Sequence, residues 1–280
     1  MECIPVLSVT KDSIAEAWET AVLRLYTFGY PIATQYDKPG DPPSLDATMI
    51  ITIRDPVCEP MIHRSFPGGL EDLQEYVMEV CDGIKDHLIR NPLDPEDKRW
   101  EYTYHQRLFK YIVGEHLFDQ IEMVAHNLAK APHTRRAQAI TWKVWEDNSC
   151  YDPACLQSIW CRILKDENDI WWLNTNVRFR SNDAYKAAFM NIFALVMLQQ
   201  KIAARVSELS GKEVRLGRYV HMADSFHLYG SYFEEFENTF LALYHKRPLL
   251  ADRTYSYVEY AKAIMDEAIP MITEKAKNMR

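Results

Sequence analysis

The pattern of hydrophobic and polar positions along the chain predicts both helices and strands. A capping box at residues 13–16 opens a helix whose apolar positions continue to Leu25, and Gly29 ends it. Residues 47–54 alternate between apolar and polar side chains, which predicts a strand. Residues 70–88 return to the spacing of an amphipathic helix.

The rest of the chain continues this mixture. Residues 108–131 predict another helix. Runs rich in β-branched and aromatic residues predict three successive strands, at residues 137–145, 155–164 and 171–180. A long apolar helix is expected at 183–209, a strand at 217–229, and helices from about Tyr232 onward. Because strands follow one another directly, we predict an α+β fold, with helices packed on a mixed sheet.

Composition limits the class of protein. The chain has 280 residues, 48% of them hydrophobic, and contains no linker, repeat or low-complexity tract, so we predict one domain over residues 1–280. A formal net charge of -8 argues against a general nucleic-acid-binding surface. The N-terminal residues lack a basic region followed by a long apolar run, and no uncharged apolar stretch approaches the roughly 20 residues of a membrane span, so we expect neither export nor a spanning helix. Six cysteines without a CxxC motif suggest reduced thiols, and we expect a cytoplasmic protein.

Candidate chemistry concentrates between residues 135 and 183. Arg135, Arg136 and Arg180 carry forked donors that match phosphate oxygens, and Ser181 adds a hydroxyl. The alternative for paired arginines is a solvated face with ordinary ion pairs. Cys155 is a candidate nucleophile, since a cysteine thiolate is available near neutral pH and nearby arginines would lower its pKa further.

Two alternatives qualify these assignments. A cysteine is more often structural than catalytic, and Cys150 lies five residues from Cys155 in a polar loop. The histidines and aspartate of the segment from His221 to His227 could suggest a metal site. Asp224 would face away from both histidines in an extended strand, so we expect no metal.

The order of these motifs carries a family resemblance. Arg135-Arg136, Cys155, the run RSND from Arg180, Asn191 and the HLY triplet from His227 occur in register. In this respect the chain resembles the thymidylate synthase and pyrimidine hydroxymethylase family. It resembles the archaeal and viral branches most, because Leu-Gln follows the cysteine. Two departures are Ala154 and Leu156, where many family members have proline and histidine.

The resemblance implies a role for each matching residue. Cys155 would be the nucleophile, Glu59 would relay protons through water, and Tyr104 would belong to the hydrogen-bond network of the active site. Asp183 would contact the pterin of 5,10-methylenetetrahydrofolate or a related methylene-pterin. The pyrimidine nucleoside monophosphate would be bound by Lys38, Arg135, Arg136, Gln157, Arg180, Ser181, Asn191, His227 and Tyr229. The family is homodimeric, with Arg135 and Arg136 reaching the partner's site.

Several of these roles have plain alternatives. Glu59 could be a surface carboxylate beside Pro60, Lys38 a solvated lysine in a turn, and Asp183 an N-cap of the following helix. Asn191 lies eight residues beyond Asp183; on one helix the two side chains would point within roughly 80° of each other and could face one pocket. His227 and Tyr229 would share one side of a strand and reach one sugar hydroxyl.

Three activities remain open from the sequence. The first is a thymidylate synthase that converts dUMP to dTMP, and the amide of Asn191 favours this uracil substrate. The second is a 5-hydroxymethylase acting on dUMP, dCMP or CMP, in which water replaces hydride as the final acceptor. The third is an inactive relative that binds a nucleotide or RNA.

Overall fold

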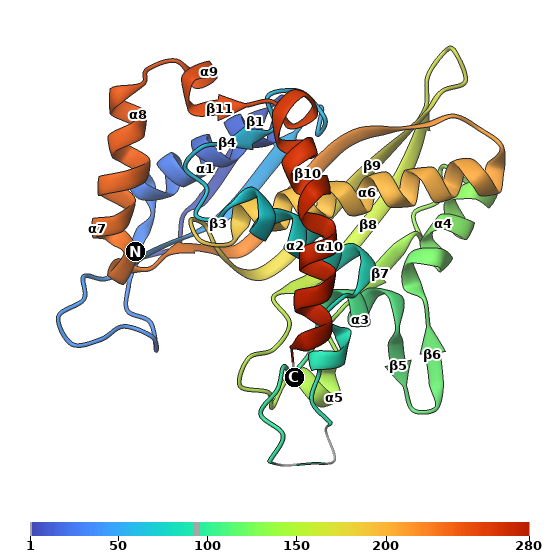
Figure 1. The fold of residues 1–280 in the computed structure, drawn as a ribbon, viewed down its shortest axis with the longest axis horizontal. Coiled ribbons are helices and arrows are strands. Elements are labelled where there is room, and N and C mark those ends of the chain that lie inside the picture. Colours follow the sequence, from blue (N-terminus) through green and yellow to red (C-terminus); the bar gives the residue numbers. More distant parts are fainter. Residues whose placement is uncertain (1, 92–93, 95, 280) are drawn as a thin grey trace. The chain divides into compact units, whose positions relative to one another are not determined.

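The computed structural model describes residues 2–91, 94 and 96–279, and it divides into two compact units (Figure 1). Unit 1 comprises Met1–Gly68, Arg178–Phe193 and Arg218–Ala263. Unit 2 comprises Gly69–Val177, Ala194–Gly217 and Ile264–Arg280. Four elements have residues in both units, namely β9 (Trp171–Asp183), α6 (Ala188–Ser210), β10 (Val214–Leu228) and α10 (Lys262–Asn278). The single domain over residues 1–280 stays a prediction.

The main sheet is mixed. Its strand order is β1-β3-β10-β9-β8-β7, and β2 also pairs with β3. In unit 1, β1 (Val6–Lys11) runs parallel to β3 (Ser44–Ile53), whereas β2 (Tyr30–Ile32) and β10 run antiparallel to β3. In unit 2, β7 (Gln138–Ile140) is antiparallel to β8 (Leu156–Lys165). Helices accompany the sheet in both units, which confirms the α+β prediction.

Helix α1 (Ile14–Phe28) forms the core of unit 1 together with β1 and β3. The Ser13 hydroxyl accepts the Glu16 amide hydrogen at 3.3 Å, and Gly29 ends the helix, as predicted from the capping box. The fully buried Trp18 donates from its indole nitrogen to the Ala184 carbonyl at 2.8 Å. The apolar face of α1 thus contributes Trp18 to the core with its indole nitrogen satisfied.

The remaining elements of unit 1 are short. A small antiparallel sheet pairs β4 (Ile62–His63) with β11 (Thr254–Tyr255). Most of the region after β10 is helical, as predicted. Its elements are a 3-10 turn at Gly230–Tyr232, α7 (Phe233–Phe236), a π segment at Glu237–Leu241, α8 (Ala242–Lys246), α9 (Leu250–Arg253) and a second π segment at Tyr257–Ala261.

Unit 2 contains more helices and a hairpin. Helix α10 (Lys262–Asn278) packs Ala268 and Ile272 against Met78 of α2. The strands β5 and β6 form a narrow hairpin, drawn in green in Figure 1. The other elements are α2 (Leu70–Asp82), a 3-10 turn at Asp86–Leu88, α3 (Tyr104–Phe109), β5 (Tyr111–Val113), β6 (His116–Phe118), α4 (Gln120–Lys130) and α5 (Val144–Asp147).

Two helices predicted for unit 2 are shorter in the structure than the sequence indicated. The helix predicted over 70–88 ends at Asp82, because Gly83 adopts a left-handed conformation with φ +69°. The helix predicted over 108–131 is instead the end of α3, the β5–β6 hairpin and α4. Gly114, with φ +59°, makes the hairpin turn, and the Asp119 carboxylate caps α4.

Two further boundaries differ from prediction. The strand expected at 137–145 ends at Ile140, because the Lys143 amide donates to the Asp147 carboxylate at 2.6 Å and a short helix follows. The helix expected from Asp183 begins at Ala188. Asp183 is the last residue of β9, so it does not share a helix with Asn191, and the expected angle between their side chains does not apply.

Candidate active site

The loop that carries Cys155 is held by hydrogen bonds from both sides. The Cys155 amide donates to the Tyr102 hydroxyl and the Leu156 amide to the Tyr104 hydroxyl, each at 3.4 Å. The Gln157 carboxamide donates to the Ala154 carbonyl at 2.7 Å. Ala154 and Leu156 are fully buried, whereas Cys155 is only half-buried. The small and aliphatic residues around the cysteine therefore anchor the loop and leave the thiol partly accessible.

The two tyrosines come from one segment of unit 2. Tyr104 starts α3, where the Thr103 hydroxyl accepts the Gln106 amide hydrogen at 2.9 Å. Burial raises the pKa of both Tyr102 and Tyr104, so both phenols stay protonated at neutral pH. Tyr104 was predicted for this site and Tyr102 was not. The signal was present in the YTY run, where two positions in an extended segment face one side.

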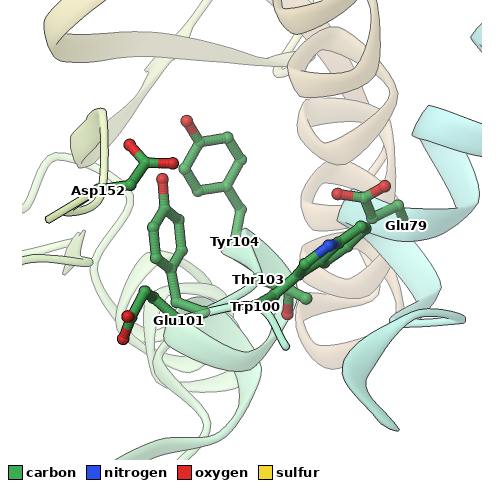
Figure 2. Close-up of a pocket in the computed structure, with 7 residues that line it drawn as sticks. Glu79, Trp100, Glu101, Thr103, Tyr104 and Asp152 are labelled. Atoms are coloured by element: carbon green, nitrogen blue, oxygen red, sulfur yellow. The ribbon is translucent and has the colours of Figure 1, made fainter. Parts of the chain in front are cut away.

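A cavity of about 320 Å³ lies next to these tyrosines. Figure 2 shows Tyr104 and Asp152 on one side of it, with Trp100 and Glu79 on the other. The lining residues are Glu79, Trp100, Glu101, Tyr102, Thr103, Tyr104 and Asp152. Indole and phenol rings offer flat faces for stacking, and carboxylates accept hydrogen bonds from ring N–H groups. The lining can therefore stack a flat ring and accept hydrogen bonds from its N–H groups.

The thiols of unit 2 differ in their surroundings. Burial raises the pKa of Cys161, and likewise that of Cys81, to about 12, which keeps both thiols protonated. Burial also raises the pKa of Cys150. These shifts oppose thiolate formation at the three positions, so none of them has the environment of an activated nucleophile.

Arg135 and Arg136 are exposed side chains on an anchored backbone. The Trp160 indole donates to the Arg135 carbonyl at 3.2 Å, and the Arg136 amide donates to the Thr134 hydroxyl at 3.2 Å. Within the part of the chain that the structure describes, neither guanidinium makes a hydrogen bond or an ion pair. Both are therefore available to an external anion.

In unit 1 the ends of β9 and β10 lie side by side. The His221 imidazole donates from Nε2 to the Asn182 carboxamide at 2.8 Å, and the Ala184 amide donates to the His227 carbonyl at 2.8 Å. The rings of His227 and Tyr229 are 4.7 Å apart. These contacts bring the RSND run, which includes Arg180 and Ser181, next to the predicted sugar-binding pair.

Asp183 and Asn191 lie on either side of the turn between β9 and α6. The Asp183 carboxylate accepts the amide hydrogens of Tyr185 and Lys186 at 2.9 and 2.8 Å, so it caps the turn rather than the helix itself. Burial raises the pKa of Asp183 to about 6. Asn191 is in the first turn of α6 and only 6% exposed. A buried carboxamide at this position can discriminate between ligands by hydrogen bonding.

The loop containing Lys38 is attached to the same region. The Tyr36 and Tyr229 rings are 5.9 Å apart, and the Gly230 amide donates to the Ser44 hydroxyl at 3.1 Å. A Cβ on Gly230 would lie 1.8 Å from the Pro42 carbonyl oxygen, so only glycine permits this close approach. The exposed Lys38 is thus carried on a loop that packs against Tyr229.

Glu59 is exposed and already engaged. Its carboxylate accepts amide hydrogens from Met61 at 3.0 Å and from Tyr257 and Val258, both at 2.9 Å. These bonds place a negative charge at the N-terminal end of the second π segment, where it is favourable. Glu59 therefore has a structural role, besides the proton relay that the family resemblance implies.

The predicted site residues fall into two groups. Unit 2 contains Tyr104, Arg135, Arg136, Cys155 and Gln157, and unit 1 contains Lys38, Glu59, Arg180, Ser181, Asp183, Asn191, His227 and Tyr229.

Asp224, which was considered as a metal ligand, forms an ion pair with Arg178 at 3.0 Å. Across the described ranges, no group of three or more His, Cys, Asp or Glu side chains could hold a metal ion. In the same ranges no helix is long and apolar enough to cross a membrane.

Comparison with known proteins identifies the family. A family model described as thymidylate synthase matches residues 76–259, which is more than half of the chain. The chain belongs to the thymidylate synthase family. This membership confirms the resemblance inferred from the motifs between Arg135 and Tyr229, all of which lie inside the matched range.

Archaeal relatives and one solved structure agree with this membership. A protein named "Putative thymidylate synthase" from Methanocaldococcus jannaschii is 28% identical over 230 residues, covering 80% of this chain and 91% of that protein. A protein of the same name from Methanosarcina barkeri is 26% identical, covering 77% and 89%. Thermostable thymidylate synthase A from Bacillus subtilis matches with a TM-score of 0.59 and 18% identity, covering 81% and 83% of the two chains. The last comparison supports the fold alone.

Proposed function

We propose that this protein transfers a one-carbon unit from methylenetetrahydrofolate, or a related methylene-pterin, to C5 of a pyrimidine nucleoside monophosphate. The main support is a half-buried Cys155 in a loop fixed by two protonated tyrosines, in a chain that belongs to the thymidylate synthase family. The leading reaction is conversion of dUMP to dTMP. The cytoplasm is the expected location of such an enzyme.

Cys155 initiates the chemistry in this proposal. Its thiolate adds to C6 of the ring, the C5–C6 π electrons move toward C5 and O4, and C5 becomes nucleophilic. The pterin donor supplies the one-carbon unit. Tyr102 and Tyr104 fix the backbone on either side of the sulfur, which limits the positions that the thiolate can take. Glu59 is the proposed residue for proton transfer through water.

The remaining residues bind and orient the two ligands. Arg135, Arg136, Arg180, Ser181 and Lys38 are assigned to the phosphate, because together they supply forked guanidinium groups, an ammonium group and a hydroxyl. The other assignments follow the family: Asn191 for the base, Gln157 for the nucleotide, His227 and Tyr229 for the sugar, and Asp183 for the pterin.

We further propose that the enzyme is a homodimer in which Arg135 and Arg136 bind the nucleotide of the partner subunit. The support is that both guanidinium groups are exposed and make no ion pair within the described residues. Charged side chains left in this state are suited to an anion that belongs to another molecule.

One experiment separates the possible reactions. The protein is incubated with methylenetetrahydrofolate and with dUMP, dCMP or CMP, and the mass of the product is measured by mass spectrometry. A gain of one methyl group in dUMP supports thymidylate synthesis, whereas a gain of a hydroxymethyl group assigns the hydroxymethylase. No product, together with no tritium release from C5-labelled nucleotides, would leave the inactive nucleotide-binding or RNA-binding relative.

The role of Cys155 has its own test with a matched control. Cys155→Ala should abolish turnover while nucleotide binding, measured by calorimetry, survives, because the phosphate contacts lie on other residues. Cys150→Ala removes a thiol five positions away and should leave turnover within about twofold of the parent. Activity of Cys155→Ala within about tenfold of the parent would exclude it as the nucleophile.

A further inference from the structure

In unit 1, His227 belongs to a short network of side-chain hydrogen bonds. Asp46 of β3 lies directly opposite His227 of β10 in the antiparallel register. The Ser225 hydroxyl donates to Asp46 Oδ2 at 2.8 Å. The hydroxyl oxygen of Ser225 also lies 3.3 Å from His227 Nδ1. Asp46 and His227 are 8% and 7% exposed. Three side chains from neighbouring strands thus form one connected group, in which Ser225 is partly exposed and the other two are buried.

The direction of each proton follows from counting donors. A serine hydroxyl has one hydrogen, and an ionised carboxylate can only accept. If Ser225 donates to Asp46, its oxygen can only accept from His227, so the imidazole hydrogen must be on Nδ1. The opposite tautomer would require Ser225 to donate to the imidazole. Asp46 would then lose the hydrogen bond from Ser225, and its other oxygen, Oδ1, has no hydrogen-bond partner among the described residues.

The protonation state of His227 agrees with this assignment. Burial lowers the pKa of His227 to about 4, so the ring is neutral near pH 7 and carries one hydrogen. With that hydrogen on Nδ1, the lone pair of Nε2 is an acceptor. Within the described residues no group donates to Nε2. A nearly buried acceptor without a donor is suited to a ligand that brings a hydroxyl hydrogen.

We propose that Asp46, acting through Ser225, is a positioning residue that fixes His227 as a hydrogen-bond acceptor, so that the site selects a nucleotide whose sugar presents a free hydroxyl donor. This inference rests on the proposed function, which assigns His227 to the sugar. Neither Asp46 nor Ser225 touches the nucleotide. They set the tautomer before the substrate arrives, which lowers the reorganisation needed on binding.

Nitrogen-15 NMR of the imidazole groups tests the tautomer without any substrate. His227 is assigned by comparison with His227→Gln. In the parent at pH 7 we expect the hydrogen on Nδ1. Ser225→Ala should lose this preference, Ser225→Thr should keep it because the hydroxyl remains, and the exposed Ser8→Ala in β1 should not change it. A hydrogen on Nε2 in the parent, or a preference that persists in Ser225→Ala, would overturn the proposal.

Kinetics then test the link to recognition. With the nucleotide substrate that the mass-spectrometric assay identifies, Ser225→Ala should raise KM about tenfold, the equivalent of about 1.4 kcal/mol, with kcat changed by less than about threefold. A 3′-O-methyl analogue, which has no hydroxyl hydrogen, should bind the parent about tenfold more weakly than the substrate. Equal KM values for parent and Ser225→Ala would overturn the role in recognition. If no nucleotide reacts, the proposed function fails, whereas the NMR result still decides the tautomer.

Discussion

A buried ion pair connects the two ends of unit 1 and gives a sharp stability prediction. The Arg253 guanidinium donates to both oxygens of Glu19, from Nε at 2.6 Å and from Nη2 at 2.7 Å. The His63 ring lies 2.9 Å from the same carboxylate. The side chains of Arg253 and Glu19 are only 5% and 7% exposed. Arg253 directly precedes β11, whose Thr254 pairs with His63, so this contact fixes the β4–β11 pair to α1.

Arg253→Met removes the guanidinium and leaves the Glu19 carboxylate buried with one partner. Removing one partner of such a pair should lower the free energy of unfolding by about 3–5 kcal/mol. The exposed pair of Arg54 and Asp12, with side chains 61% and 60% exposed, provides the control. Arg54→Ala should cost no more than about 1 kcal/mol. Urea denaturation followed by tryptophan fluorescence measures both values.

The double variant Glu19→Met with Arg253→Met separates the charge from the packing. Two apolar side chains leave no uncompensated charge, so the double variant should be more stable than Arg253→Met alone. Burial raises the pKa of Glu19, but the hydrogen bonds from His63 and Arg253 outweigh it and hold that pKa below 4.5. The carboxylate therefore stabilises the fold above pH 4.5, and this contribution is lost as pH falls through the folded pKa. A loss below about 1 kcal/mol in Arg253→Met, or additive losses in the double variant, would refute the reasoning.

Three further predictions concern the dimer, the base and pH. A mixed dimer of Cys155→Ala and Arg136→Ala chains should regain one complete site, and turnover of the mixture above that of either parent measures it; an active monomer in sedimentation would contradict the proposal. Asn191→Asp should shift the ratio of kcat/KM for dUMP and dCMP toward dCMP by about 1–3 kcal/mol; an unchanged ratio would remove Asn191 from base recognition. Burial lowers the pKa of His221 to about 3 and that of His227 to about 4, so both are neutral in the fold and titrate near pH 6.5 when unfolded. The free energy of unfolding should therefore decrease as pH falls below 6.5, by about 2 kcal/mol per histidine at pH 5 relative to pH 7. Urea denaturation at the two pH values measures this difference, and equal stability would contradict the lowered pKa values of the two histidines.

Local signals explain which elements could be predicted. Helix α1 was predicted correctly because its cap at Ser13 and its end at Gly29 are decided within a few residues. The same kind of signal was missed at Gly83 and Gly114, where a left-handed glycine ends a helix or turns a hairpin inside an apolar pattern. In the segment 108–131, apolar residues occur at spacings that fit either a helix or a pair of short strands. Periodicity alone could not choose between them.

The candidate site divides in a similar way. Cys155 and Asn191 were proposed from the sequence because the family motifs around them are short and keep their order along the chain. Their supporting contacts could not be predicted, because they join distant positions. Ser225 and Asp46 are 179 residues apart in sequence, and Arg253 and Glu19 are 234 residues apart. Pairings of this kind depend on strand register and helix packing, which no single segment of the sequence determines.

The buried histidines of unit 1 show how structural and functional roles can be separated. At His63, Nδ1 accepts the Ser65 amide hydrogen at 3.1 Å, so the ring hydrogen is on Nε2 and is donated to Glu19. Both ring nitrogens are therefore used within the protein. Nothing remains for a ligand, and the ring serves to hold the β4 turn against α1.

His221 is saturated in the same way, and His227 is not. The Nε2 hydrogen of His221 is donated to Asn182, and the Tyr219 hydroxyl lies 3.3 Å from Nδ1, where it can donate. Within the described ranges, the side-chain hydrogen bond of His227 is at Nδ1, with the ring hydrogen directed to Ser225 and Nε2 left as an acceptor. A buried ring that is satisfied on one side only has a desolvated nitrogen that a ligand can pair with. Two of these buried histidines are thus satisfied at both ring nitrogens, whereas the third has an unpaired acceptor at the position that we propose for the sugar.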